Sequence, residues 1–190
     1  MRTLLLFRGA PGCGKSTFID THGLRPYALS ADDIRQTLRS PMQTADGSVQ
    51  ICQDNEKEVW ELLYRMLETR MQKGEFTVID ATNSKTSEMN KYKDLCGEYR
   101  YRMFCIDMTD LPIDECKRRN AGRIPLKRVP EDCIDKMYSR FRTQKIPSGI
   151  KVIKTESDFN SMLMHKLDMS SYEKIVVVGG GDTALTDALY

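Results

Sequence analysis

The residues that decide the fold are Thr3-Leu4-Leu5-Leu6-Phe7-Arg8, followed by Gly9-Ala10-Pro11-Gly12-Cys13-Gly14-Lys15-Ser16-Thr17 and then Phe18-Ile19. The short apolar run predicts a buried strand, and the segment after the glycines is compatible with a helix. Between them, residues 9–16 match the pattern G-x-x-x-x-G-K-[ST]. A strand before this pattern and a helix after it favour a phosphate-binding loop over an ordinary glycine-rich turn.

Each residue type in this loop serves phosphate binding in a different way. Glycines permit backbone angles that a side chain would hinder, so successive N–H groups can turn toward phosphate oxygens. The helix expected from about Lys15 points the positive end of its dipole at the same anion. Lys15 would reach the β- and γ-phosphates, and the Ser16 hydroxyl could ligate Mg²⁺. The predicted nucleotide-binding residues are Gly9, Ala10, Pro11, Gly12, Cys13, Gly14, Lys15, Ser16 and Thr17.

Length and composition indicate an ordinary globular protein. The 190 residues suit one α/β domain, or one domain and the start of another. The net charge of +2 gives no general argument for nucleic-acid binding, but residues 110–154 hold twelve Lys and Arg against six Asp and Glu. That imbalance predicts a local basic surface, with a solvated mixed-charge face as the alternative. Six cysteines without a C-x-x-C pair indicate reduced thiols in a cytoplasmic protein. We expect no signal peptide and no membrane-spanning segment.

A second candidate element is Ser30-Ala31-Asp32-Asp33-Ile34-Arg35, which follows a short strand predicted at 27–30. Acidic residues at a helix N-terminus are stabilised by the helix dipole, so helix capping is one interpretation of Asp32 and Asp33. The other places one of these two aspartates beside the phosphate loop, free to accept a proton. Arg35 lies one helical turn after Asp32, on the same helix face. Together, the acid and the arginine could bind an acceptor hydroxyl and a nearby phosphate.

A third element is the strand predicted at 76–79, which ends in Asp80-Ala81-Thr82-Asn83. Ligands bind at the carboxyl ends of the strands in open parallel sheets. Asp80 could therefore hold a magnesium-bound water or orient an arginine. The simpler interpretation is that Asp80 caps the following loop.

The basic segment 119–129 is interrupted by Gly122, Pro125 and the Val129-Pro130 pair, so it cannot be a regular helix throughout. Such a segment in a nucleotide-binding fold is a candidate lid. Arg119 and Arg123 would close over the γ-phosphate and stabilise the charge of the transferring group. A plain basic surface loop is the alternative.

The remaining segments receive structural interpretations. Helical spacing of apolar residues indicates several helices. Trp60 lies in the helix predicted at 54–73 and is expected to pack without a chemical role. Residues 40–50 are predicted as an exposed polar loop. Residues 174–190 contain a strand and a glycine-rich turn, which we interpret as the altered start of a further domain. The predicted helices are 54–73, 87–98, a helix starting near 109–112, 130–142 and 158–167, and the further strands are 101–108 and 151–153.

Over residues 2–145, these motifs together resemble the 5′-hydroxyl polynucleotide kinase family, the kinase module of end-healing kinase-phosphatases. The resemblance rests on the phosphate loop, on Asp32 with Arg35, on the strand end from Asp80 to Asn83, and on the two lid arginines. It implies an α/β fold with an adenylate-kinase-like parallel sheet, helices on both faces and a small lid. The kinase domain would span 1–155, and 156–190 would form a C-terminal extension.

The resemblance also implies an activity: transfer of the γ-phosphate of ATP, with Mg²⁺, to the 5′-hydroxyl of RNA or DNA. Lys15, Asp32, Arg119 and Arg123 would be catalytic, with Asp32 as the general base and Ser16 on the metal. Thr17 would bind the α-phosphate, and Arg35 would grip the 3′-phosphate of the acceptor. Asp80 and Asn83 would also bind substrate, with Asp80 orienting Arg35 or a metal-bound water. Phosphatase or ligase domains are the expected partners. A small-molecule kinase and a non-catalytic nucleotide-binding module remain the alternatives.

Overall fold

The computed structural model describes residues 2–45, 47–54 and 56–164. It divides into two compact units, 1–153 and 154–190. In the second unit, the described part contains the helix α7 (Glu156–Met164), where the sequence predicts a helix over 158–167. The further-domain start predicted at 174–190 lies outside the described residues. None of the described helices is long and apolar enough to cross a membrane.

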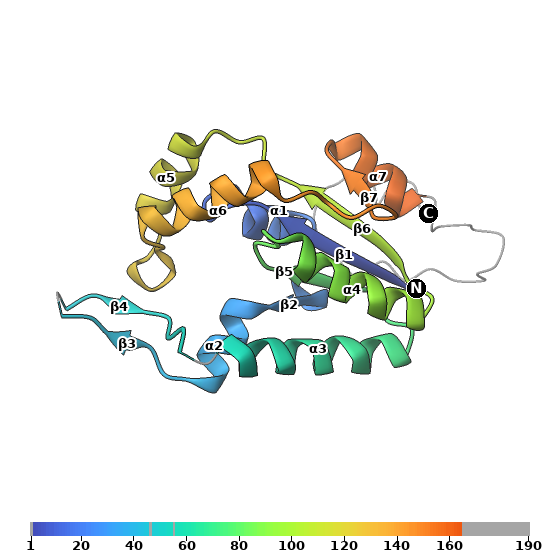
Figure 1. Cartoon of the computed structure of the whole chain (residues 1–190), viewed down its shortest axis with the longest axis horizontal. Helices are drawn as coiled ribbons and strands as arrows, with labels where there is room; N and C mark the ends of the chain where they lie inside the picture. The colour runs from blue at the N-terminus through green and yellow to red at the C-terminus, as the bar shows by residue number, and fades with distance from the viewer. Residues whose placement is uncertain (1, 46, 55, 165–190) are drawn as a thin grey trace. The chain divides into compact units, whose positions relative to one another are not determined.

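The first unit is built on a parallel sheet of five strands in the order β2-β5-β1-β6-β7 (Figure 1). The central strand pairs on both sides, with Leu5 opposite Val78 on one neighbour and opposite Phe104 on the other. All six residues of this strand are buried, which explains its unbroken apolar run, because a parallel sheet is covered on both faces. The strands are β1 (Thr3–Arg8), β2 (Ala28–Ser30), β5 (Thr77–Asp80), β6 (Arg102–Asp107) and β7 (Lys151–Ile153).

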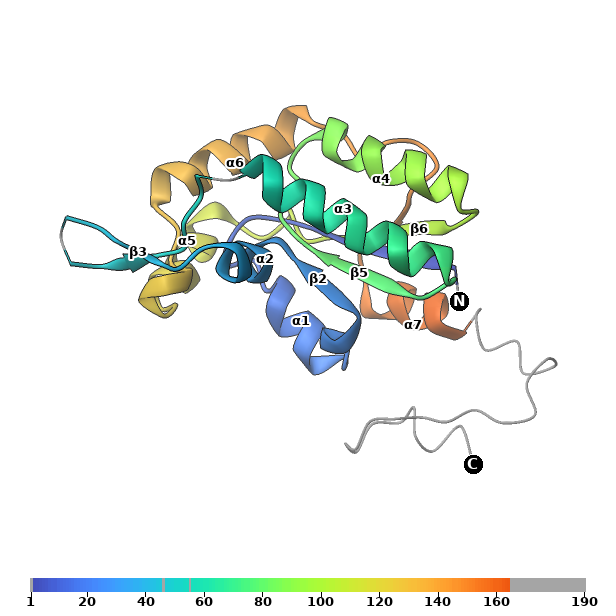
Figure 2. The ribbon, with the colours of Figure 1, turned by 90° about the horizontal axis from the view of Figure 1, so that it is seen from below.

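Helices cover both faces of this sheet, so the predicted fold class is confirmed (Figure 2). On one face, Leu4 and Leu6 of β1 belong to the core that α3 and α4 fill. On the other, the ring of Phe7 lies 5.6 Å from that of Phe18 on α1. Alternate residues of one strand thus support opposite layers. The helices are α1 (Lys15–Thr21), α2 (Ala31–Leu38), α3 (Glu56–Gln72), α4 (Thr86–Glu98), α5 (Ile113–Ala121) and α6 (Glu131–Thr143).

The long helix α3 shows how the sequence specifies this packing. Its buried residues Val59, Leu63, Leu67 and Met71 recur every four positions and are at most 2% exposed. This spacing places one apolar stripe against the sheet. Gly74 follows with a positive φ of 74° and ends the helix, as the sequence predicts.

The segment 40–50 is not the simple loop predicted from its polar composition. It forms an antiparallel pair of two-residue strands, β3 (Met42–Gln43) and β4 (Val49–Gln50), with Met42 opposite Gln50. Figure 1 shows this hairpin extending beyond α2. The strands are too short and too polar to produce a recognisable alternation in the sequence.

Candidate active site

The phosphate loop has the backbone conformation that its glycines predict. Gly12 and Gly14 have positive φ angles of 85° and 105°. A Cβ on Gly12 would lie 2.3 Å from the carbonyl oxygen of Cys116 on α5, so only glycine allows this approach. The Lys15 ammonium folds back onto the loop and donates to the carbonyl oxygens of Gly9 (2.7 Å) and Ala10 (3.0 Å). The loop therefore offers the narrow backbone cradle that a nucleotide phosphate requires.

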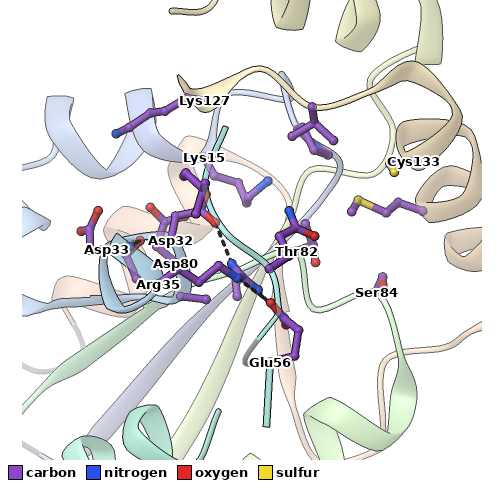
Figure 3. A pocket seen from close by; sticks show the side chains of 18 of the residues that line it. Lys15, Asp32, Asp33, Arg35, Glu56, Asp80, Thr82, Ser84, Lys127 and Cys133 are labelled. Atoms are coloured by element: carbon purple, nitrogen blue, oxygen red, sulfur yellow. Dashed lines mark hydrogen bonds and ion pairs between the residues drawn. The ribbon is translucent and has the colours of Figure 1, made fainter. Parts of the chain in front are cut away.

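This loop forms one wall of a cleft of about 1230 Å³. Figure 3 shows Lys15, Asp32 and Asp80 gathered in the same part of it. The volume exceeds the roughly 300–1,000 Å³ that usually holds one small ligand, so a nucleotide and a second substrate have room together. The residues that line it include ten Lys and Arg against seven Asp and Glu, which favours anionic ligands.

Asp32 lies in this cleft at the start of α2. The Ser30 hydroxyl caps that helix by accepting from the Asp33 amide (3.3 Å), which leaves the Asp32 carboxylate available for other contacts. One of its oxygens accepts from Arg35 Nη1 at 2.7 Å, and the side chain is 51% exposed. The structure thus places Asp32 and Arg35 in one cleft, as their spacing of one helical turn predicts, and their ion pair is a contact that the sequence did not indicate.

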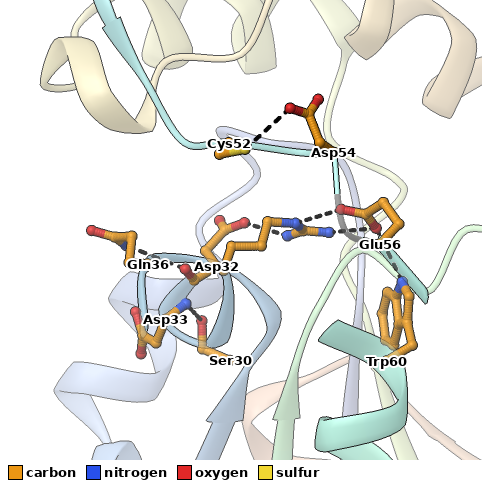
Figure 4. A network of polar contacts seen from close by, with 9 residues as sticks. Ser30, Asp32, Asp33, Gln36, Cys52, Asp54, Glu56 and Trp60 are labelled. Carbon is orange, nitrogen blue, oxygen red and sulfur yellow. Dashed lines mark hydrogen bonds and ion pairs between the residues drawn. The ribbon is translucent and has the colours of Figure 1, made fainter. Parts of the chain in front are cut away.

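Arg35 is held by a second carboxylate, Glu56, which the sequence did not indicate (Figure 4). Arg35 Nε and Nη2 donate to the two Glu56 oxygens at 2.6 and 2.8 Å, and Trp60 Nε1 donates to Oε2 at 3.1 Å. Partial burial raises the pKa of Glu56, but the hydrogen bonds and charge of Arg35 outweigh it, so the net pKa is lowered. Trp60, to which the sequence assigned no chemistry, therefore belongs to the polar network of the cleft.

Asp80 ends β5 in the same cleft, with a side chain that is 11% exposed. Burial raises the pKa of this carboxyl, and the charges of Lys15 and Arg25 only partly offset the effect. Its ion pair is with Arg25 (Nη1 to Oδ2, 3.4 Å). The hypothesis that Asp80 orients Arg35 is wrong in this structure, because Glu56 does so. A magnesium-bound water on Asp80 stays a prediction.

Asn83, predicted to bind substrate, instead supports the backbone. Its side chain is 1% exposed and donates to the carbonyl oxygen of Phe7 at 2.6 Å, while its φ is 46°. Asparagine tolerates this left-handed conformation better than most residues. The side chain therefore ties the turn after β5 to the end of β1, directly before the phosphate loop, and does not line the cleft.

The segment predicted as a lid begins at the end of α5. Arg119 and Arg123 both line the cleft, and Arg119 Nε donates to Glu115 Oε1 at 2.6 Å. The buried Asn120 fixes the base of the segment: its amide donates to the carbonyl oxygen of Val129 (2.7 Å) and accepts from the Val129 amide (3.1 Å). The residues between form a turn that includes the 3₁₀ helix Pro125–Lys127. Lys127 and Arg140, which were not predicted, also line the cleft.

Magnesium has few protein ligands available here. Among residues 2–45, 47–54 and 56–164, no group of three or more His, Cys, Asp or Glu side chains could hold a metal ion. The Ser16 hydroxyl lines the cleft beside Lys15, and Asp80 lies in the same cleft. Such a site fits an ion that is carried in largely by nucleotide phosphates, as Mg²⁺ usually is.

Comparison with known sequences identifies the family. The sequence model of the AAA domain family matches residues 4–143, from β1 to the end of α6. The chain belongs to this family. As an AAA domain protein, it has a kinase-like P-loop fold, and its phosphate loop and lid segment both lie within the matched residues. No curated protein matches the chain.

Solved structures support the same fold. A candidate kinase from Chloroflexus aurantiacus is similar over 86% of this chain and 96% of its own, with 19% identity and a TM-score of 0.56. Kti12 of Chaetomium thermophilum in complex with ADP-AlF3 gives 87% and 97% coverage, 12% identity and a TM-score of 0.57. A sugar kinase from Janibacter sp. HTCC2649 is similar over 86% of this chain and 94% of its own, with 17% identity and a TM-score of 0.56. At these identities the likeness establishes the fold alone.

Proposed function

We propose that this AAA domain protein transfers the γ-phosphoryl group of ATP to the 5′-hydroxyl of an RNA or DNA end. The observation that supports this most is the half-exposed Asp32 carboxylate in the same cleft as Lys15 and Ser16. An alcohol is a weak nucleophile, and a carboxylate positioned to take its proton contributes about 10²–10⁴-fold to the rate.

The donor side of the cleft would work through placement and charge. The loop amides and Lys15 would hold the β- and γ-phosphates, and Thr17 the α-phosphate. Bound Mg²⁺, held through Ser16, would supply neutralisation of the phosphate charge. Arg119 and Arg123 would stabilise the additional charge on the transferring group.

On the acceptor side, Arg35 would bind a phosphate of the nucleic acid. Its three described bonds to carboxylates use three of the five N–H groups of a guanidinium. Donors therefore remain for an acceptor phosphate. The product, a 5′-phosphate end, is what a nucleic-acid ligase consumes, so ligase or phosphatase partners fit this proposal.

The same ion pairs favour a second candidate, a kinase that acts on a small alcohol. Asp32 and Glu56 together more than compensate the charge of Arg35, so an uncharged acceptor would not be disfavoured. The two candidates differ in whether the acceptor needs a phosphate.

Transfer from labelled ATP to adenosine, adenosine 3′-phosphate, and 5′-hydroxyl RNA and DNA oligomers tests both. We expect the oligomers and the 3′-phosphate to be preferred over adenosine. Asp32→Asn should lower the rate at least 100-fold, a magnitude typical of general-base loss. Asp33→Asn, one position away on the same helix end, is the matched control and should retain activity. Transfer by Asp32→Asn at the wild-type rate would refute the base assignment, and a preference for unphosphorylated small alcohols would favour the second candidate.

A further inference from the structure

An aromatic surface in the cleft has no role in the proposed transfer step. Trp60 and Tyr64 of α3 both line the cleft and are half-buried. Their ring centroids lie 6.4 Å apart, and the ring of Tyr64 lies 5.3 Å from the buried Tyr92 of α4. The buried Tyr92 therefore packs against Tyr64, and the bond to Glu56 holds the Trp60 ring.

This surface is tied to the candidate base by side-chain contacts. Trp60 donates to Glu56, Glu56 accepts from Arg35, and Arg35 donates to Asp32. Figure 4 shows Trp60 below Glu56 and Asp32 to the left of it, and all three line the cleft. Trp60 therefore lies in the same part of the cleft as the candidate base, where the acceptor would bind.

Charge around the rings suits a nucleic acid. Lys91 lines the cleft, and its ammonium lies 5.7 Å from the centroid of the Tyr64 ring. An aromatic face next to a lysine is the combination with which proteins bind single-stranded nucleic acid, since a base stacks while a cation contacts the backbone phosphate. The indole N–H is already bonded to Glu56, which fixes the orientation of the ring, and the half-buried side chain lines the cleft.

We propose that Trp60 and Tyr64 form the subsite that stacks the nucleobase at the 5′ end of the acceptor, with Lys91 beside the backbone phosphate. This inference rests on the proposed function and specifies what the acceptor must carry. It makes the base, as well as the hydroxyl and the phosphate, part of recognition. Stacking accepts every base, so the subsite would give affinity without sequence preference.

The test combines removal of the indole with removal of the base. The acceptors are a 5′-hydroxyl trinucleotide and the same trinucleotide with an abasic first position. Base stacking corresponds to about a 5- to 150-fold change in affinity. We expect the wild type to show a KM raised by that factor for the abasic acceptor. Trp60→Ala should raise the KM of the normal acceptor similarly and leave the abasic KM unchanged. Trp60→Phe, which keeps an aromatic face but loses the bond to Glu56, should retain discrimination.

Tyr27→Ala is the matched control for loss of an aromatic ring. Tyr27 is 48% exposed and is absent from the described lining of the cleft. A stability defect would affect both acceptors equally, whereas loss of stacking affects only the acceptor that has the base. If Trp60→Ala raises the KM by the same factor for both trinucleotides, or only the KM for ATP, the inference is refuted.

Failure of the proposed function can be distinguished from failure of this inference. Trp60 is the single tryptophan of the chain, so its fluorescence reports on the site without turnover. The normal trinucleotide should quench it at lower concentration than the abasic one. Quenching without any phosphorylation would refute the proposed function and retain the subsite. Phosphorylation combined with equal quenching by the two trinucleotides, or with no quenching by either, would refute the subsite and retain the proposed function.

Discussion

Replacing Gly12 with alanine tests the contact between the phosphate loop and α5. The added Cβ would lie 2.3 Å from the Cys116 carbonyl oxygen and 3.1 Å from its carbon, whereas ordinary contacts begin near 3.4 Å. The loop and the helix would have to separate by about 1 Å, and overpacking of this kind costs about 1–3 kcal/mol. The positive φ of 85° adds about 1–2 kcal/mol for a residue with a side chain.

The expected loss of about 2–5 kcal/mol is a large part of the roughly 5–15 kcal/mol that stabilises a domain. The midpoint temperature of thermal unfolding should fall by about 10 °C for a chain of this size. ATP should also stabilise the variant less than the wild type, because ligand stabilisation depends on affinity for the folded state.

Gly97→Ala is the matched control, since Gly97 is exposed within α4 and a Cβ there meets nothing within 4 Å. It should be neutral or stabilising by about 0.5–1 kcal/mol. Wild-type unfolding and ATP response in Gly12→Ala would refute the described contact.

Two further predictions concern charged residues of the cleft. Because the pKa of Glu56 is lowered in the folded protein, its pair with Arg35 contributes stability above the ordinary pKa of 4.5 and loses it as the pH falls. Glu56→Gln should therefore lower the free energy of unfolding by about 1 kcal/mol at pH 7 and by much less near pH 3. Denaturant titrations at both pH values measure this difference. An equal loss at both pH values would contradict the ion pair. Arg119→Ala should lower kcat for phosphoryl transfer about 100-fold. Arg118→Ala is the control, because Arg118 is the other partner of Glu115 and is absent from the described lining of the cleft. This variant should change kcat at most a few-fold. Equal effects of the two substitutions on kcat would argue against a contact of Arg119 with the transferring group.

The parts of the fold that the sequence predicted are those with strong local signals. The apolar run of β1 and the glycines after it determine a strand and a loop without information from elsewhere in the chain. The repeat of Val59, Leu63 and Leu67 likewise determines α3, because a helix brings every fourth residue to one face. Asp32 and Arg35 were correctly placed on one helix face for the same reason, since they are one helical turn apart.

The residues that were missed or misplaced depend on contacts between distant segments. Glu56 is 21 positions from Arg35 in the sequence, and no local pattern indicates that they meet. The strand-end rule correctly placed Asp80 and Asn83 at one edge of the sheet. It does not say which side chain points into the cleft, and the left-handed backbone of Asn83 turns its side chain toward β1 instead.

Glu115 bears on how the cleft can receive a nucleotide. It accepts from two arginines of its own helix, Arg118 (2.7 Å to each oxygen) and Arg119 (2.6 Å). If Arg119 turns to bind an incoming phosphate, the Glu115 carboxylate is still paired with Arg118. Arg119 can therefore exchange Glu115 for a phosphate at little electrostatic cost, because Arg118 continues to neutralise the carboxylate.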